Sequence, residues 1–159
     1  MAFLQKVKTF WQLPIKQKLF FFLNYGLSGI AKATILLLPY RILSRYFGYS
    51  HQMTVASTLL TTSQQYRRAH MLRQAVRLAC AYTPWDSSCL TQALLAKFWC
   101  SHWGIPYFFY IGLLKNSTKP LGKDAHAWVT AGPLAITGGY CFQTHHVISS
   151  FSSIRFHVY

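Results

Sequence analysis

Residues 83–95 read Thr-Pro-Trp-Asp-Ser-Ser-Cys-Leu-Thr-Gln-Ala-Leu-Leu, a pattern typical of a loop that ends where a helix begins. Pro84 disfavours a helical conformation for the residue before it. Asp86 and the two serines after it are residue types that cap helix N-termini through side-chain oxygens, and Asp86 is the preferred cap. Cys89 is therefore expected in the first helical turn, where unpaired backbone N–H groups and the helix dipole favour the reactive thiolate.

A second block, residues 124–129, reads Asp-Ala-His-Ala-Trp-Val and predicts a strand that carries His126. A cysteine at a helix start followed by a histidine on a later strand is typical of papain-like and transglutaminase-like thiol enzymes. Cys89 is then the candidate nucleophile and His126 the candidate general base. A lone cysteine or histidine in such surroundings is more often a packed core residue, and it is the combination that favours catalysis. The other three cysteines, at positions 80, 100 and 141, lack this setting and are assigned to the core.

Several short motifs resemble those of the lasso-peptide maturation proteases, the transglutaminase-like B proteins that remove the leader from a lasso-peptide precursor. They are Pro84-Trp85-x-x-x-Cys89-Leu90, Gly104-Ile105-Pro106, Ile111-Gly112 and Ala125-His126-Ala127-Trp128-Val129. The resemblance runs from about Leu13 to the C-terminus. It implies a cysteine endopeptidase, with no room in the chain for the leader-binding module of larger members. A separate leader-binding protein would present the precursor, and a macrolactam-forming cyclase would act next.

A third group normally orients the catalytic imidazole. In the family's pattern an aspartate follows the histidine by about a dozen residues, but this register contains no carboxylate here. Asp124 lies two residues before His126 on the same predicted strand, so both side chains point the same way. The rivals for this role are Thr137, a backbone carbonyl and Asp86, although the helix cap is the preferred role of Asp86. For the oxyanion hole, the Cys89 backbone N–H is the best candidate, and His145 and His146 are rival histidines without a strand context.

The charge balance is strongly basic: 16 Lys and Arg residues against two acidic residues give a formal net charge of +14. Such an excess indicates an anionic partner, either an acidic peptide, a phospholipid surface or nucleic acid, or else a solvated basic face. No nucleic-acid-binding signature accompanies the charge, so we expect no nucleic-acid partner. The four cysteines form no CxxC pair and no cleavable signal peptide is evident, which indicates the cytoplasm. We expect no metal site and no cofactor.

Residues 1–62 are interpreted as a basic and apolar helical segment that packs on the core. Residues 16–38 predict one or two apolar helices, and polar interruptions such as Asn24 leave no clean membrane span. Core packing is favoured over an in-plane membrane helix, which would place the protein peripherally at the inner membrane face. A short basic helix over 39–47 and an exposed linker over 49–62 follow.

Residues 63–159 are interpreted as the catalytic domain, a compact α+β unit in which a Cys-bearing helix packs on an antiparallel sheet. The expected helices are 63–82 and 87–102, and the second is expected to bury Leu90, Ala93, Leu94 and Phe98. The expected strands are 107–114 in the centre, 125–130, 134–137, and two edge strands at 147–150 and 154–158. The same Cys–His machinery would also suit an acyltransferase, and the missing aspartate leaves a non-catalytic basic scaffold as a further alternative.

Overall fold

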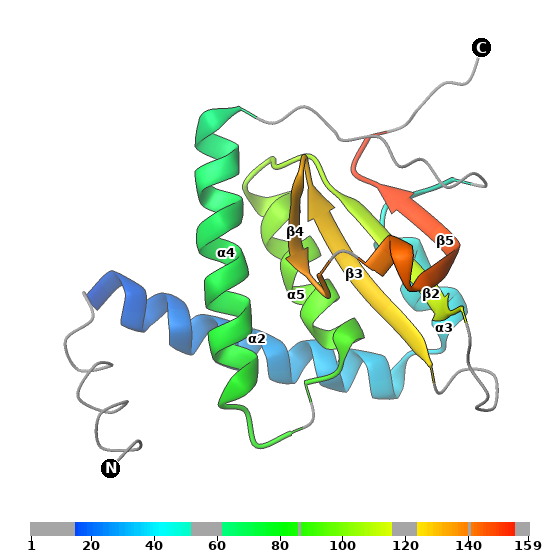
Figure 1. Ribbon diagram of the computed structural model, residues 1–159. Coiled ribbons are helices and arrows are strands. Elements are labelled where there is room, and N and C mark those ends of the chain that lie inside the picture. Colours follow the sequence, from blue (N-terminus) through cyan, green and yellow to red (C-terminus); the bar gives the residue numbers. More distant parts are fainter. Residues whose placement is uncertain (1–14, 52–61, 86, 116–123, 140, 155–159) are drawn as a thin grey trace.

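The computed structural model describes residues 15–51, 62–85, 87–115, 124–139 and 141–154, and it shows helices packed against an antiparallel sheet (Figure 1). The helical elements are α2 (Ile15–Leu37), α3 (Tyr40–Leu43), η1 (Ser44–Tyr46), α4 (Ser63–Ala81), α5 (Cys89–His102) and η2 (Cys141–Gln143). The strands are β1 (Tyr49–His51), β2 (Phe108–Leu114), β3 (Ala125–Ala131), β4 (Leu134–Thr137) and β5 (His145–Ser152). The predicted α+β class, with a Cys-bearing helix on an antiparallel sheet behind an apolar N-terminal helix, is confirmed. The predicted boundary between segments at residue 62 stays a prediction.

The N-terminal apolar run forms one helix, α2, which crosses α4 at a steep angle (Figure 1). One side of α2 packs against α4 and α5. Asn24 is fully buried there, and its side-chain oxygen accepts a hydrogen bond from the Trp99 indole N–H of α5 at 2.9 Å. Because the burial of an unpaired polar group is costly, this bond fixes how α2 sits on α5.

Helix α4 follows its predicted pattern closely. Thr62 and Gln65 form a reciprocal capping box at its start, which satisfies two backbone N–H groups. Ala69, Leu72 and Val76 are buried on the predicted face. The predicted helix over 63–82 is thus confirmed.

Helix α5 begins at Cys89, two residues after the predicted start, and the prediction of its buried face is partly wrong. Phe98 is exposed, whereas Leu95, Ala96 and Trp99 are buried. The reason is that α5 contacts α2 and α4 as well as β3 and β4. A helix covered from several sides has no single apolar stripe, so helical periodicity cannot identify its inner face.

The strands form one sheet in the order β1-β5-β2-β3-β4, in which β2 is central as predicted. The predicted edge strand at 147–150 is wrong, because it belongs to β5, which pairs with both β1 and β2. A simple meander would place β5 beside β4, but the chain instead returns to the other side of β2. The predicted linker over 49–62 is also wrong at its start, because Tyr49–His51 forms β1. The rest of that linker, residues 52–61, and most of the predicted strand over 154–158 lie outside the described residues.

Candidate active site

The first turn of α5 holds Cys89 in place through its cap. The Ser88 side chain accepts a hydrogen bond from the Thr91 N–H, which makes Ser88 the N-cap. The preference for Asp86 as the cap is therefore wrong, and Asp86 itself lies outside the described residues. The Gln92 side chain donates to the Ser87 carbonyl at 3.1 Å, so the turn before the cysteine is tied to the helix that follows it. Cys89 is thus the first residue of the helix, with its thiol half-buried.

The loop before Cys89 rests on α2. The Trp85 ring lies 5.2 Å from the Tyr25 ring, measured between centroids. A Cβ atom added at Gly29 would come within 3.2 Å of the same indole, so the helix backbone approaches Trp85 closely at this position. Helix α2 therefore supports the loop that leads into the candidate nucleophile.

The start of β3 lies against Cys89. Its Sγ atom is 3.9 Å from the Ala125 carbonyl oxygen, and the thiol is hydrogen-bonded to the His126 side chain. Burial is the largest single influence on the thiol and raises its pKa. The thiol pKa is lowered by the hydrogen bond and charge of His126 and by backbone groups of Ala127 and Leu90. Together these effects exceed the effect of burial, so the net pKa of Cys89 lies below the ordinary value of a thiol. Two segments far apart in the sequence thus meet around one sulfur atom.

The His126 ring has a second partner on its other side. Its Nε2 atom is 3.3 Å from the Gly138 carbonyl oxygen. A carbonyl only accepts, so Nε2 carries the proton of this hydrogen bond, and Nδ1 is the ring nitrogen that remains to take the thiol proton. The hydrogen bond to Cys89 is the largest cause that raises the His126 pKa; burial opposes it, while the Cys89 charge and the Gly138 carbonyl add to it. A lowered thiol pKa beside a raised imidazole pKa favours the thiolate–imidazolium pair.

In a comparison with known protein families, residues 34–150 match the family described as the Transglutaminase-like superfamily. The match covers most of the chain and includes every side chain of this site. The chain belongs to the transglutaminase-like superfamily. Neither the comparison with curated proteins nor the comparison with solved structures found a match. Members of this superfamily are in general cysteine-dependent enzymes, and in this transglutaminase-like chain Cys89 and His126 lie together as such an enzyme requires.

The hydrogen-bond acceptor that the structure shows at the His126 ring is a different group from the two predicted side chains, the Asp124 carboxylate and the Thr137 hydroxyl. The Thr137 hydroxyl accepts a hydrogen bond from the Val129 N–H at 3.2 Å, inside the sheet between β3 and β4. The Asp124 carboxylate acts electrostatically on His145, where it raises the pKa. The acceptor found at the His126 ring is instead the Gly138 carbonyl, one of the alternatives that the sequence left open. A catalytic role for Asp124 stays a prediction.

Two further side chains lie beside the transglutaminase-like site: His145, which the sequence offered only as a rival histidine, and half-buried Cys141, which the sequence assigned to the core. His145 starts β5, and its ring centroid lies 5.2 Å from that of His126; the expectation that it lacks a strand context is wrong. Burial and the positive charge of His126 lower the His145 pKa, against weaker opposing effects of the Cys141 backbone and Asp124. The Cys141 thiol donates to the Gly138 carbonyl at 2.8 Å, and burial first, then the Cys89 charge, raises its pKa. The β-rich run after His145 was the sequence signal that could have placed it.

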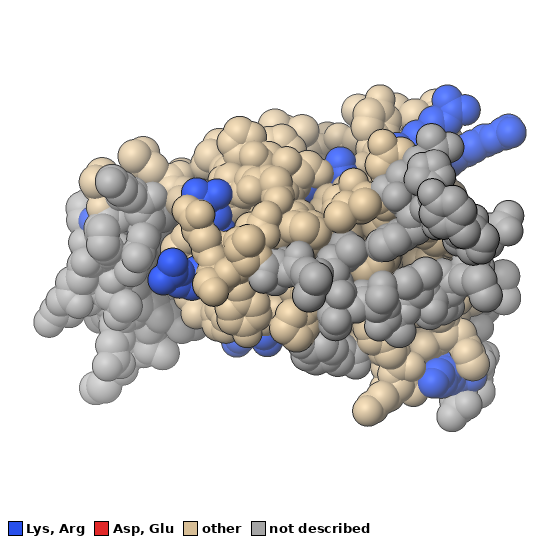
Figure 2. Space-filling model, turned by 90° about the horizontal axis from the view of Figure 1, so that it is seen from above, with Lys and Arg blue, Asp and Glu red and all other residues tan. Residues whose placement is uncertain are grey.

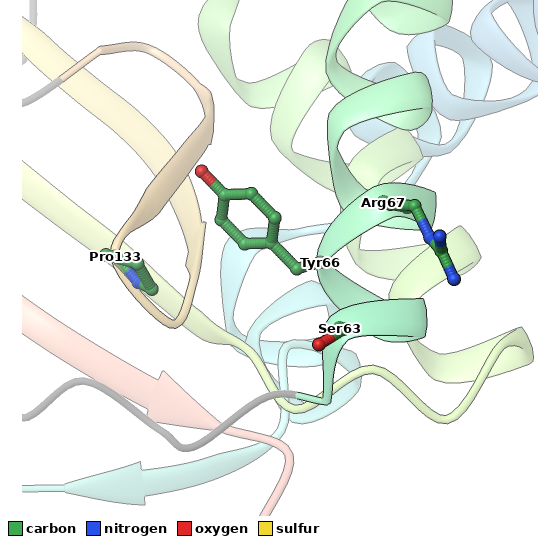
Figure 3. Close-up of a pocket in the computed structure, with 4 residues that line it drawn as sticks. All are labelled: Ser63, Tyr66, Arg67 and Pro133. Atoms are coloured by element: carbon green, nitrogen blue, oxygen red, sulfur yellow. The ribbon is translucent and has the colours of Figure 1, made fainter.

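A separate cavity of about 400 Å³ is lined by residues that do not belong to this site (Figure 3). Its lining is Ser63, Tyr66 and Arg67 from the start of α4, with Pro133 from the β3–β4 turn. Tyr66 points toward that turn, whereas the Arg67 guanidinium points away from it (Figure 3). Gln65, beside these residues, bonds to the Gly104 carbonyl past the end of α5, so the cavity is roughly 20 Å, one helix length, from Cys89. It therefore takes no part in the chemistry of the thiol.

The thiol pKa predicts the pH dependence of Cys89 alkylation. We expect iodoacetamide to modify Cys89 faster at neutral pH than an unperturbed thiol, because its lowered pKa leaves more thiolate. His126→Ala removes the largest effects that lower the Cys89 pKa and keeps the burial that raises it, so the alkylation curve should move to higher pH. Site-resolved peptide mass spectrometry measures both. Cys80, equally half-buried but with a raised pKa, is the control thiol in the same sample, and His146→Ala is the control variant. Identical curves for Cys89 and Cys80 would show that the ion pair does not form.

Proposed function

We propose that this protein is a cysteine endopeptidase that removes the leader from a lasso-peptide precursor. The observation that supports it most is the pairing of Cys89, at the start of α5, with His126 on β3. The family membership supports cysteine-dependent chemistry in general. The choice of a lasso precursor as substrate rests on the resemblance of the motifs around the two residues to the lasso-peptide maturation proteases.

The proposed reaction begins with the Cys89 thiolate, whose proton is held by His126. The sulfur attacks the carbonyl carbon of the last leader residue, and the developing oxyanion is stabilised by the Cys89 N–H, which has no intrahelical acceptor in the first turn. His126 then protonates the nitrogen, the C–N bond breaks, and the core peptide leaves with a free α-amine. The leader remains bound as a thioester. Water hydrolyses the thioester, with His126 as the base, and restores the thiol.

The proposed partners follow from the same resemblance. A separate leader-binding protein presents the precursor, and a macrolactam-forming cyclase receives the released core peptide. The basic excess of the chain suits a contact with acidic surfaces of such partners. The cytoplasm, where precursors of this kind are made, is the proposed location.

The proposal is tested by incubating the purified full chain with a lasso-peptide precursor and its leader-binding protein in H₂¹⁸O. We expect two products by mass spectrometry: a core peptide with a free α-amine, and a leader whose new carboxylate carries one ¹⁸O atom. A leader joined to an added amine in place of water would identify an acyltransferase instead. An intact precursor, despite demonstrated binding of the leader by the partner, would contradict the peptidase proposal.

A further inference from the structure

Helix α2 presents an apolar stripe to solvent from Leu19 to Leu37. The large side chains on this stripe are half or more exposed: Leu19, Phe22, Leu23, Ile30, Leu36 and Leu37. Their spacing follows the helical repeat, and the exposed positions between them are Gly26 and Ala33, so no charged residue interrupts the stripe. At 1.5 Å per residue the helix is about 34 Å long. An apolar surface this long is unusual on a soluble protein and marks an interaction site.

The opposite side of α2 is held by the core. Phe20 packs on the Trp99 ring at 4.9 Å between centroids, and buried Asn24 is hydrogen-bonded to the same indole. Residues Lys18–Leu37 are long and apolar enough to cross a membrane, with a mean hydropathy of 1.4, and only 11% of that stretch is buried. A spanning helix would have to leave Trp99 and carry Asn24 into lipid without its partner, which is costly. A helix that keeps these contacts can meet a membrane only by lying along its surface, not by crossing it.

Positive charge accompanies the stripe. Lys18 and Lys32 are half-buried, and the helical repeat places them at the edge of the stripe. A long lysine side chain at such an edge can extend its charged group away from the apolar surface toward polar surroundings. The next elements, α3 and η1, expose Arg41 and Arg45 beside exposed tyrosines at positions 40 and 46. Lys and Arg side chains also lie at several separate places on the face seen from above in Figure 2, so the positive charge extends beyond α2 and the elements next to it. The formal net charge of the chain is +14.

An apolar groove continues the stripe toward α5. It has a volume of about 290 Å³, and Ile30 from the stripe, Tyr46 from η1 and Phe98 from α5 are among its lining residues. Its walls are almost wholly apolar, so it offers few hydrogen-bonding groups to a protein partner, whose interfaces typically carry a polar rim. Acyl chains need no such groups. Aromatic and basic residues around an apolar helix face are instead typical of helices that lie in a lipid interface.

We propose that the α2 apolar stripe, with the basic and aromatic residues of α3 and η1 beside it, binds the surface of an anionic phospholipid membrane. Helix α2 lies parallel to the surface with the stripe among the acyl chains, while the lysines and arginines meet the lipid phosphates. The interaction is independent of Cys89. It localises the protein at the membrane whatever peptide it acts on.

The test is co-sedimentation of the full chain with vesicles. We expect binding to vesicles of phosphatidylglycerol and phosphatidylcholine (1:1), weaker binding to phosphatidylcholine alone, and partial release at 0.5 M NaCl as the charges are screened. Leu19→Glu/Ile30→Glu places two carboxylates in the stripe and should lower the partition coefficient at least tenfold. The matched control is Met71→Glu/Ile148→Glu, which makes the same chemical change at two equally exposed apolar positions on α4 and β5, and should leave binding within about twofold of the parent.

Two results would overturn the proposal. One is equal loss of binding in both double variants, which would mean that net charge alone controls it. The other is a wild-type chain that stays in the supernatant with anionic vesicles at low salt. If light scattering then shows a dimer that Leu19→Glu/Ile30→Glu dissociates, the stripe is an interface between two copies of this chain. Circular dichroism of each variant confirms that the fold is kept, and Cys89→Ser should bind vesicles like the wild type.

Discussion

Cys89→Ser is expected to reduce the rate of precursor cleavage by at least about a thousandfold, the kind of loss seen when a covalent nucleophile is removed. The substitution keeps the size and the helix start but replaces a thiol of lowered pKa with a hydroxyl. A hydroxyl does not ionise near neutral pH, so no ion pair with His126 forms and the attacking group is a poor nucleophile. The measurement is the single-turnover rate of leader release, followed by mass spectrometry in the presence of the leader-binding protein.

The matched control is Cys80→Ser, at another half-buried cysteine of the same chain. Burial raises the Cys80 pKa, and we expect this variant to cleave within about twofold of the wild type. Unfolding midpoints for both variants separate loss of chemistry from loss of structure. Leader release by Cys89→Ser at the rate of Cys80→Ser would show that the chain acts as a non-catalytic scaffold in the maturation.

The sequence was sufficient to predict the start of the Cys89 helix to within two residues and the strand at His126, because both depend on local chemistry. Pro84 and the serines before Cys89 limit where a helix can begin. The run around His126 is apolar and β-rich, which is the pattern of a buried strand, and in the sheet it pairs with β2. What brings the thiol to the imidazole is the packing of α5 on β3, which an α+β arrangement of this kind makes expected.

The surroundings of the pair could not be predicted in the same way. His145 reaches the site because β5 returns to pair with β2, and a strand order is a property of the whole sheet. Ser88 rather than Asp86 caps α5, a choice between neighbouring residues that all have suitable side chains. The acceptor for His126 is a backbone carbonyl, and every residue has one. Only the backbone conformation at Gly138 distinguishes this carbonyl from the others.

Gly138→Ala is expected to displace the His126 ring and lower the cleavage rate by roughly 10- to 100-fold, the scale of a catalytic group misplaced by about 1 Å. Gly138 has a φ of +72°, in the left-handed region. A Cβ atom there would lie 2.8 Å from His126 Nε2 and 2.6 Å from the Trp128 Cβ, distances that require one of the neighbours to move. The imidazole then loses the Gly138 carbonyl and its alignment with the thiol. The His126 pKa, raised mainly by the hydrogen bond to Cys89, should fall toward or below its usual value.

Gly139→Ala is the matched control for this change. Gly139 has nearly the same backbone conformation, with a φ of +70°, but an added Cβ meets no atom within 4 Å. Both variants bear a backbone cost of about 1–2 kcal/mol for an alanine in the left-handed region, so only the contact with the ring differs between them. NMR titration of His126 and the cleavage rate should therefore change in Gly138→Ala and stay near wild type in Gly139→Ala. If the two variants share one His126 pKa and one rate, the Gly138 carbonyl does not orient the imidazole, and a carboxylate such as Asp124 becomes the leading candidate for that role.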